Sequence, residues 1–250
     1  MTPYPILGKP KANVLLDAFM AGCGDLKQDA AVFYGVNDTN IEHWRRVQRM
    51  GTTYYSIDNS YFDKTRGFKQ PHAQFRITKN RFQVQVQGMT SDGRRFAALG
   101  IQLRPWQPPR PGQCVVVCPQ SDEFMRDIAK YPGNWTELAL KAACAKYPDS
   151  AVVVRGWQRD KLKAASSLPH DLENAHLLVT HSSAAAVTAL IHGVPVQVSS
   201  MSALWGCNFD RTNDNCPVRL AAMGVLADNQ FSLEEIASGK AWSWINTNGV

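Results

Sequence analysis

The sequence predicts an α/β protein of two domains, and three observations support this. Between residues 113 and 199, short apolar runs alternate with helical patterns, the order expected when helices join the strands of a parallel sheet. Residues 105–111 contain four prolines and cannot continue a helix or a central strand, so we place the domain boundary between residues 111 and 112. Charge divides there too, with 16 Lys and Arg against 8 Asp and Glu in residues 1–112, and 11 against 13 in the remainder.

The second domain, residues 112–250, has the more regular pattern. The run QCVVVC is of the kind that is buried on both faces of a parallel sheet. Asn134 is a suitable N-cap for the helix that follows it, and Tyr147-Pro148-Asp149 ends that helix. The elements expected here are strands at 113–118, 151–155, 175–180 and 194–199, helices at 134–146, 182–192 and 232–245, and a short helix that residues 168–172 precede.

The pattern of the first domain, residues 1–111, predicts a smaller α/β unit with a net positive charge. Its apolar residues recur at helical spacing in two segments, the second of which stops at Gly51, a natural residue after a helix end. The run FQVQVQ alternates strictly, which indicates a half-exposed strand or one arm of a hairpin. The expected helices are 11–23 and 40–50, and the expected strands are 30–36, 52–57, 75–78 and 82–87.

Polar residues follow three strands of the second domain, where ligands of open parallel sheets bind. The turn after Thr180 opens a helix of small residues, whose first N–H groups carry partial positive charge and suit a phosphate. Two simpler interpretations remain open: Ser182 only caps the helix, and Arg155 is a surface arginine. The residues expected to bind this ligand are Gln120, Arg155, Gly156, His181, Ser182, Ser183 and Ala184.

A resemblance rests on the strand ending in Pro119-Gln120, the strand ending in Arg155, and the segment LLVTHSSAAAVTALIHGVPVQV. Together they are similar to the nucleotide-binding half of GT-B glycosyltransferases, especially the capsule-polysaccharide and Kdo-transferase-like group, over residues 113–205. This resemblance implies two Rossmann-like domains that face a central cleft, with C-terminal helices that pack back across the junction. It also implies a nucleotide sugar, such as a UDP-sugar, whose phosphates lie at Ser182 and Ser183.

Three further segments, YYSIDNSYF, FRITKN and LADNQFSLEEI, resemble phage-encoded proteins that act on modified DNA bases. This resemblance implies that the acceptor is a 5-hydroxymethylpyrimidine in DNA, such as 5-hydroxymethylcytosine, and that the protein works in the host cytoplasm. The basic first domain agrees with a polyanionic partner. The residues expected to contact DNA phosphates are Arg45, Arg46, Arg49, Lys64, Arg66, Arg76, Lys79 and Arg81.

Glycosyl transfer needs a base that accepts the proton of the attacking hydroxyl group. We expect Asp58 to be this base, because it ends a strand that the implied fold directs to the cleft. Asp38 is the second candidate and His72 the third. A purely structural role for Asp58, capping the turn after its strand, remains open.

The composition excludes several other classes of protein. No apolar stretch is long enough to cross a membrane, and the N-terminal residues lack the apolar core of a signal peptide, which favours a cytoplasmic protein without a membrane partner. The six cysteines include no CxxC pair and suit reduced thiols. We predict no metal site and no permanently bound cofactor, and the sequence leaves open the need for a divalent ion and the oligomeric state. Two alternative functions remain: transfer to a polysaccharide or lipid-linked glycan, and a non-catalytic nucleotide- or DNA-binding module.

Overall fold

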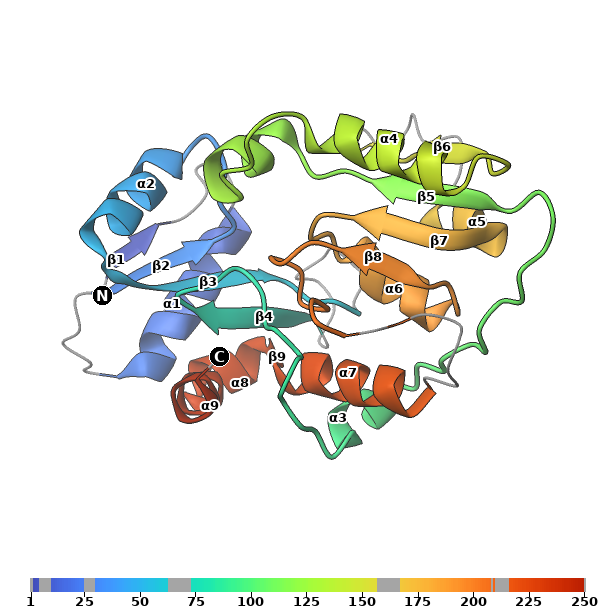
Figure 1. Ribbon diagram of the computed structural model, residues 1–250. Coiled ribbons are helices and arrows are strands. Elements are labelled where there is room, and N and C mark those ends of the chain that lie inside the picture. The colour runs from blue at the N-terminus through green and yellow to red at the C-terminus, as the bar shows by residue number, and fades with distance from the viewer. Residues whose placement is uncertain are drawn as a thin grey trace. The chain divides into compact units, whose positions relative to one another are not determined.

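The computed structural model describes residues 2–4, 10–24, 30–62, 73–156, 167–207, 209 and 216–249. The chain divides into two compact units (Figure 1). Unit 1 contains residues Met1–Val84 and Leu226–Val250, and unit 2 contains Gln85–Val225. Unit 2 is therefore an insertion into unit 1, and the last 25 residues belong with the first 84. This division differs from the boundary at residue 111 that the prolines indicated.

Unit 1 contains a mixed sheet of five strands in the order β1-β2-β3-β4-β9. The first three strands are parallel; the helix-strand alternation predicted this for β2 and β3, whereas β1 was not predicted. Strand β4 is antiparallel to both of its neighbours. The register pairs Asp58 of β3 with Arg76 of β4. The strands are β1 (Thr2–Tyr4), β2 (Ala30–Tyr34), β3 (Thr53–Asn59), β4 (Gln74–Lys79) and β9 (Gln230–Ser232).

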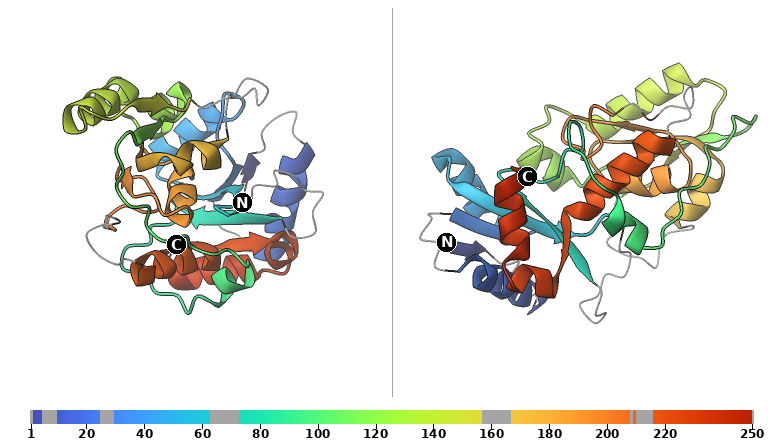
Figure 2. Two further views of the ribbon diagram at one scale, coloured as in Figure 1. Left: turned by 90° about the vertical axis from the view of Figure 1, so that its right-hand side faces the viewer. Right: turned by 90° about the horizontal axis from the view of Figure 1, so that it is seen from below.

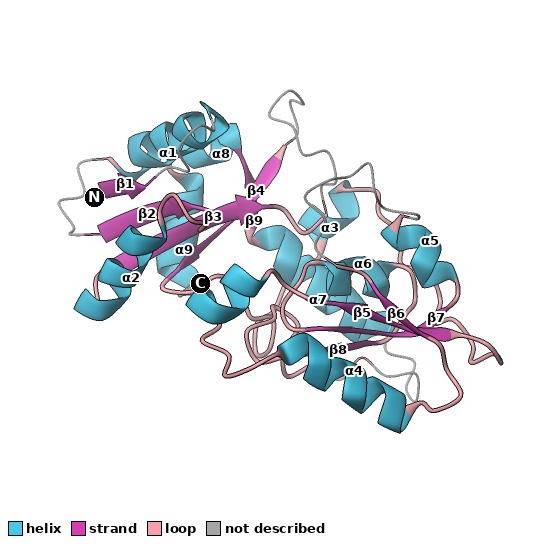
Figure 3. Ribbon diagram, turned by 90° about the horizontal axis from the view of Figure 1, so that it is seen from above, coloured by secondary structure: helices cyan, strands magenta, loops and turns pink. Residues whose placement is uncertain are grey.

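Helices cover both faces of this sheet (Figure 3). On one face, α1 (Pro10–Cys23), α8 (Leu233–Ala237) and α9 (Lys240–Asn248) share a core with the strands. On the other, α2 (Ile41–Met50) buries Trp44 and Val47. The close approach of α1 to α8 requires glycine at residue 22, because a Cβ atom there would lie 2.0 Å from the main-chain oxygen of Ile236.

Unit 2 contains a parallel sheet of four strands in the order β6-β5-β7-β8. The strands are β5 (Cys114–Cys118), β6 (Val152–Val154), β7 (Ala175–Thr180) and β8 (Val196–Val198). One face is covered by α4 (Trp135–Lys146) and the other by α5 (Leu168–Glu173) and α6 (Ala185–Ile191) (Figure 3). The predicted order of these elements is confirmed, and the side chain of Asn134 caps α4 by accepting from the N–H of Glu137 (3.1 Å).

Three helical elements were not predicted. A π-helix, η1 (Phe124–Ile128), follows β5, while α3 (Arg94–Ala98) and α7 (Cys216–Asp228) lie side by side (Figure 2). A Cβ atom on Gly224 of α7 would lie 2.6 Å from the hydroxyl of Ser91, just before α3. Among the described residues, no helix combines the length and the apolar character needed to cross a membrane.

The proline-rich segment, residues 104–111, is attached to unit 2 rather than free. The N–H of Arg104 donates to the oxygen of Ile191 (2.9 Å), and the N–H of Gln107 donates to that of Gly193 (2.8 Å). Gly193 has φ 73°, and a Cβ atom there would lie 1.9 Å from the oxygen of Pro105. The prolines therefore end regular structure, as expected, but they do not mark a domain linker.

Residues 82–87 form no strand, contrary to the expectation from their alternating pattern. Burial alternates over residues 84–87, where Val84 and Val86 are buried and Gln85 and Gln87 are exposed, but Gln83 is also buried. The main chain makes a hydrogen bond from the N–H of Val86 to the oxygen of Ala203 (2.9 Å). An alternation of apolar and polar residues thus indicates a half-buried segment and does not require a strand that is paired in a sheet.

Candidate functional site

The carboxyl ends of β5, β6 and β7 meet at one edge of the unit 2 sheet. The register aligns Val117 with Val154 and Cys118 with Thr180. Because these strands are parallel, the residues that follow them gather at this edge, as the sequence predicted. The structure brings Gln120 and Ser182 into contact there, with Nε2 of Gln120 donating to Oγ of Ser182 (3.0 Å).

The turn that follows β7 is held by its own hydroxyl groups. Oγ1 of Thr180 donates to the oxygen of Cys118 (2.6 Å) and accepts from the N–H of Ser183 (3.3 Å). Oγ of Ser183 accepts from the N–H of Ala185 (3.2 Å). We expected the N–H groups of this turn to be unpaired and to face a phosphate. Those of Ser183 and Ala185 instead donate to hydroxyl groups of the turn itself.

The two serines of this turn differ in accessibility. Ser182 is 1% exposed, while Ser183 is half-buried. The helix α6 begins at Ala185 with Ala184 at its N-cap position and no side-chain cap, so Ser182 is not the capping residue. Of the two hydroxyl groups, that of Ser183 is the one that lies nearer to solvent.

His181 lies in a box of three aromatic rings. Its ring centroid is 6.4 Å from that of Phe124, 6.0 Å from that of Tyr131 and 5.9 Å from that of Trp135, all in edge-to-face geometry. The residue is 4% exposed, and burial lowers the pKa of its imidazole. Its Nδ1 lies 3.3 Å from Oγ of Ser182. A neutral imidazole is therefore the favoured state at the end of β7.

The aromatic box was missed by the sequence analysis. Phe124 lies in the π-helix η1, a type of helix that occurs frequently at functional sites. The signal available in the sequence was position: Phe124 and Tyr131 both lie in the segment after β5, which begins with Pro119-Gln120 at the edge where we placed the ligand. Side chains of this segment therefore had to lie near the end of β7.

Arg155 lies at the carboxyl end of β6, where its N–H donates to the oxygen of Val117 (2.8 Å). Its guanidinium group forms an ion pair with Asp171 of α5, and the side chains are 26% and 12% exposed. Asp171 was not predicted as a partner. The neighbouring Gly156 is exposed, and no atom of the described residues lies within 4 Å of the position that a Cβ would take.

A pocket of about 170 Å³ lies between α4 and the strands β7 and β8. Its lining includes the aromatic rings of Trp135 and Tyr147 and the polar residues Thr180 and Ser199. The N–H of Ser199 donates to the oxygen of His181 (3.0 Å), so the pocket borders the turn after β7.

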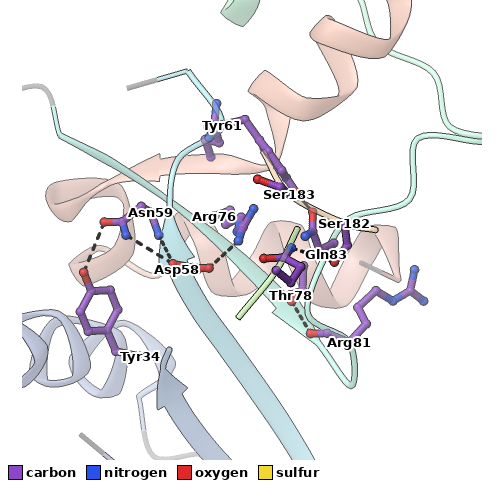
Figure 4. A network of polar contacts seen from close by, with 12 residues as sticks. Tyr34, Asp58, Asn59, Tyr61, Arg76, Thr78, Arg81, Gln83, Ser182 and Ser183 are labelled. Atoms are coloured by element: carbon purple, nitrogen blue, oxygen red, sulfur yellow. Dashed lines mark hydrogen bonds and ion pairs between the residues drawn. The ribbon is translucent and has the colours of Figure 1, made fainter. Parts of the chain in front are cut away.

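In unit 1, Asp58 lies near the end of β3 and forms an ion pair with Arg76 of β4 (Figure 4). The N–H of Asn59 donates to Oδ1 of Asp58 (2.7 Å). The Asp58 side chain is 39% exposed and that of Arg76 only 11%. Asp58 therefore presents a fixed carboxylate at the surface, while Arg76, expected to contact DNA phosphates, is buried beneath it.

The guanidinium group of Arg76 also lies 4.8 Å from the ring centroid of Tyr61. Burial acts to lower the pKa of Arg76, but the Asp58 carboxylate and the Tyr61 oxygen together outweigh it, so this pKa lies above its ordinary value. Burial raises the pKa of the Tyr61 hydroxyl. Arg76 is consequently a permanent positive charge that holds Asp58 in place.

The other expected residues of unit 1 are dispersed. Asp38 is exposed in the turn before α2 and does not end a strand, because β2 stops at Tyr34. On α2, Arg45 pairs with Glu42. Nζ of Lys79 donates to Oδ1 of Asn246 (2.9 Å). Three of the arginines expected to contact DNA are exposed, namely Arg46, Arg49 and Arg81. Three other candidates lie outside the described residues, namely His72, Lys64 and Arg66.

Within the ranges that the structure describes, no three His, Cys, Asp or Glu side chains are grouped in a way that could hold a metal ion. The polar groups at the edge of the unit 2 sheet are amide, hydroxyl, imidazole and guanidinium groups, together with the Asp171 carboxylate that pairs with Arg155. The first four kinds of group suit an oxygen-rich anionic ligand. They make that edge the candidate ligand site of unit 2, and the fixed carboxylate of Asp58 the candidate reactive group of unit 1.

The fold of the two units is of the GT-B-like α/β class, as predicted. It is similar to two solved structures from Thermosulfurimonas dismutans. The first, KpsC beta Kdo 2,4 transferase, has a TM-score of 0.54 and 14% identity, and the match covers 90% of each chain. The second, KpsC beta Kdo 2,7 transferase, has a TM-score of 0.52 and 15% identity, and covers 97% of this chain and 91% of the other. No protein-family model matches the chain, and comparison with curated proteins gave no match.

Proposed function

We propose that this protein is a glycosyltransferase that moves a sugar from a nucleotide sugar to a hydroxyl group of a polysaccharide. The observation that carries the proposal is the likeness to the two Kdo transferases, which covers at least 90% of this chain and of each of theirs. Both units of the chain contribute to such a match, so it extends beyond the nucleotide-binding half that the sequence motifs suggested.

The acceptor that we propose differs from the DNA base expected from the sequence. No comparison supports a DNA acceptor, whereas the alternative of polysaccharide synthesis agrees with the names of both similar structures. The exposed arginines of unit 1, Arg46, Arg49 and Arg81, suit a glycan that contains acidic sugars as well as they suit DNA.

The proposed chemistry divides between the two units. In unit 2, Gln120, Arg155 and the turn at Ser183 supply neutral and positive donors for the phosphate group of the donor sugar. In unit 1, the Asp58 carboxylate takes the proton of the acceptor hydroxyl as its oxygen bonds to the anomeric carbon. The bond from that carbon to the phosphate oxygen breaks, and the phosphate leaves with the electron pair.

The test combines a panel of nucleotide sugars, including an activated Kdo, with three sets of acceptors. These are acidic oligosaccharides, hydroxymethylated DNA beside plain DNA, and no acceptor. Mass spectrometry of the products should show a sugar increment on an oligosaccharide. A sugar increment on a nucleoside from the digested DNA would show that DNA is the acceptor. The absence of both transfer and donor hydrolysis would favour a non-catalytic binding module.

Two aspartate variants make the assignment of the base specific. Asp58→Asn should reduce transfer by about 10²- to 10⁴-fold, the usual contribution of a general base, while binding of the nucleotide sugar is kept. Asp17→Asn is the matched control, because Asp17 is an exposed aspartate of α1 in the same unit. If Asp58→Asn abolished donor binding and left transfer per bound donor unchanged, the role given to Asp58 would be refuted.

A further inference from the structure

Three side chains at the edge of the unit 2 sheet lie within hydrogen-bond distance of one another in sequence. Nε2 of Gln120 donates to Oγ of Ser182 (3.0 Å), and Oγ of Ser182 lies 3.3 Å from Nδ1 of His181. We propose that Gln120 and Ser182 are positioning residues that fix the imidazole of His181 as the tautomer with its hydrogen on Nε2.

The direction that we propose for the chain starts from the Gln120 amide. The amide nitrogen of Gln120 can only donate, so Oγ of Ser182 accepts from it. A serine hydroxyl has one hydrogen of its own, and in the arrangement that we propose this hydrogen is directed at Nδ1 of His181, whose 3.3 Å distance from Oγ fits a hydrogen bond in either direction. In this arrangement Nδ1 is the unprotonated, accepting nitrogen, and the ring hydrogen is on Nε2.

The surroundings of the ring keep this arrangement in place. The edge-to-face contacts with Phe124, Tyr131 and Trp135 limit rotation of the imidazole. Burial lowers the pKa of His181, so the ring is neutral and holds a single hydrogen. The main chain is fixed on the other side, because the N–H of Ser199 donates to the oxygen of His181 (3.0 Å).

A fixed Nε2–H group is a neutral hydrogen-bond donor at the carboxyl end of β7. Its natural acceptor is an oxygen atom, and in the proposed function that oxygen belongs to the phosphate group of the donor sugar. This assignment of the ligand rests on the proposed glycosyl transfer. The tautomer itself is a property of the free protein and does not depend on it.

The experiment measures the ring nitrogens of His181 directly. The protein is labelled with ¹⁵N-histidine, and long-range ¹H–¹⁵N spectra separate protonated from unprotonated nitrogens. The His181 signals are those lost in His181→Gln. In the free protein between pH 6 and 8, we expect Nε2 to be protonated and Nδ1 unprotonated. A protonated Nδ1 would overturn the proposal.

Gln120→Glu tests the positioning role by reversing the chain. The side chain keeps its shape, but a carboxylate accepts from the Ser182 hydroxyl instead of donating to it, so Oγ of Ser182 must accept from Nδ1 of His181. We therefore expect Nδ1 to gain a proton in this variant. An unchanged Nδ1 signal in folded Gln120→Glu would remove Gln120 from the role.

Ser182→Ala and Ser183→Ala form a matched pair. Ser182→Ala breaks the chain and should leave His181 as a mixture of tautomers, whereas Ser183→Ala removes a hydroxyl that bonds to the N–H of Ala185 and should leave the His181 signals unchanged. Equal effects of the two substitutions would overturn the proposal. Since no sugar is present, loss of transfer activity and failure of this inference are separate results.

Discussion

The guanidinium group of Arg219 lies 3.9 Å from the ring centroid of Trp106. The same guanidinium, which belongs to α7, donates through Nη1 to the main-chain oxygens of Arg104 (3.0 Å) and Leu190 (2.9 Å). Arg219 is 2% exposed, so these interactions are shielded from water. Arg219 thereby joins α7, the proline-rich segment and the end of α6.

Arg219→Met should lower the free energy of unfolding by about 2 to 5 kcal/mol, because the main-chain oxygens of Arg104 and Leu190 each lose a charged donor and the stacked cation is removed. Chemical denaturation measures the change. Arg104→Met is the control: the side chain of Arg104 is exposed, and its main-chain oxygen remains, so the expected change is within about 0.5 kcal/mol. Similar losses in the two variants would show that Arg219 does not join these elements.

Asp58→Asn should also lower stability, by about 1 to 3 kcal/mol, because it leaves the buried charge of Arg76 without its partner. Arg76→Met should recover part of this loss when it is added to Asp58→Asn, and a double-mutant cycle measures the coupling. Transfer activity should stay lost in the double variant if Asp58 is the base. Recovery of activity together with stability would show that Asp58 has only a structural role.

The buried imidazole of His181 predicts a pH dependence of stability. Burial lowers the pKa of His181 in the folded protein. As the pH is decreased below the unfolded value of about 6.5, the unfolded chain therefore binds more protons than the folded protein does. The free energy of unfolding decreases over this range, until the pH reaches the folded pKa. Urea unfolding between pH 5 and 8 should show a smaller decline for His181→Phe, whose ring suits the aromatic box. His170→Gln, which removes an exposed histidine, is the control. An unchanged decline in His181→Phe would contradict the prediction.

The cysteines should differ in reactivity. Burial raises the pKa of the Cys23 and Cys118 thiols to about 12, so almost no thiolate is present at pH 8. Cys144 is exposed on α4 and should be alkylated before Cys23 and Cys118. Peptide mass spectrometry after a short treatment with iodoacetamide should find label on Cys144 but on Cys23 and Cys118 only after unfolding. Rapid native labelling of Cys118 would mean that β5 is more accessible than its 5% exposure indicates.

The elements that the sequence predicted well are those with local signals. The bounds of β7, Ala175–Thr180, agree with the expected strand, since an apolar run between a short helix and a turn defines both ends. The start of α4 follows from the cap at Asn134, which is an interaction over three residues. In both segments, neighbours in the chain determine the structure.

The features that could not be predicted depend on contacts between distant residues. The pairing of Asp58 with Arg76 requires the antiparallel register of β3 and β4, which no motif in either strand specifies. The helix α7 has apolar residues on most of its surface, so it lacks the periodicity that marks a half-exposed helix. The attachment of the proline-rich segment depends on Arg219, more than 100 residues further along the chain.

The insertion of unit 2 within unit 1 has a consequence for biosynthesis. The sheet of unit 1 lacks β9, and its core lacks Ile236 and Ile245, until residues 226–250 have been translated. Unit 2, residues 85–225, is complete before that point. On the ribosome, therefore, all residues of unit 2 are available for folding before those of unit 1. Unit 1 can complete its sheet and core only after α9 has been translated.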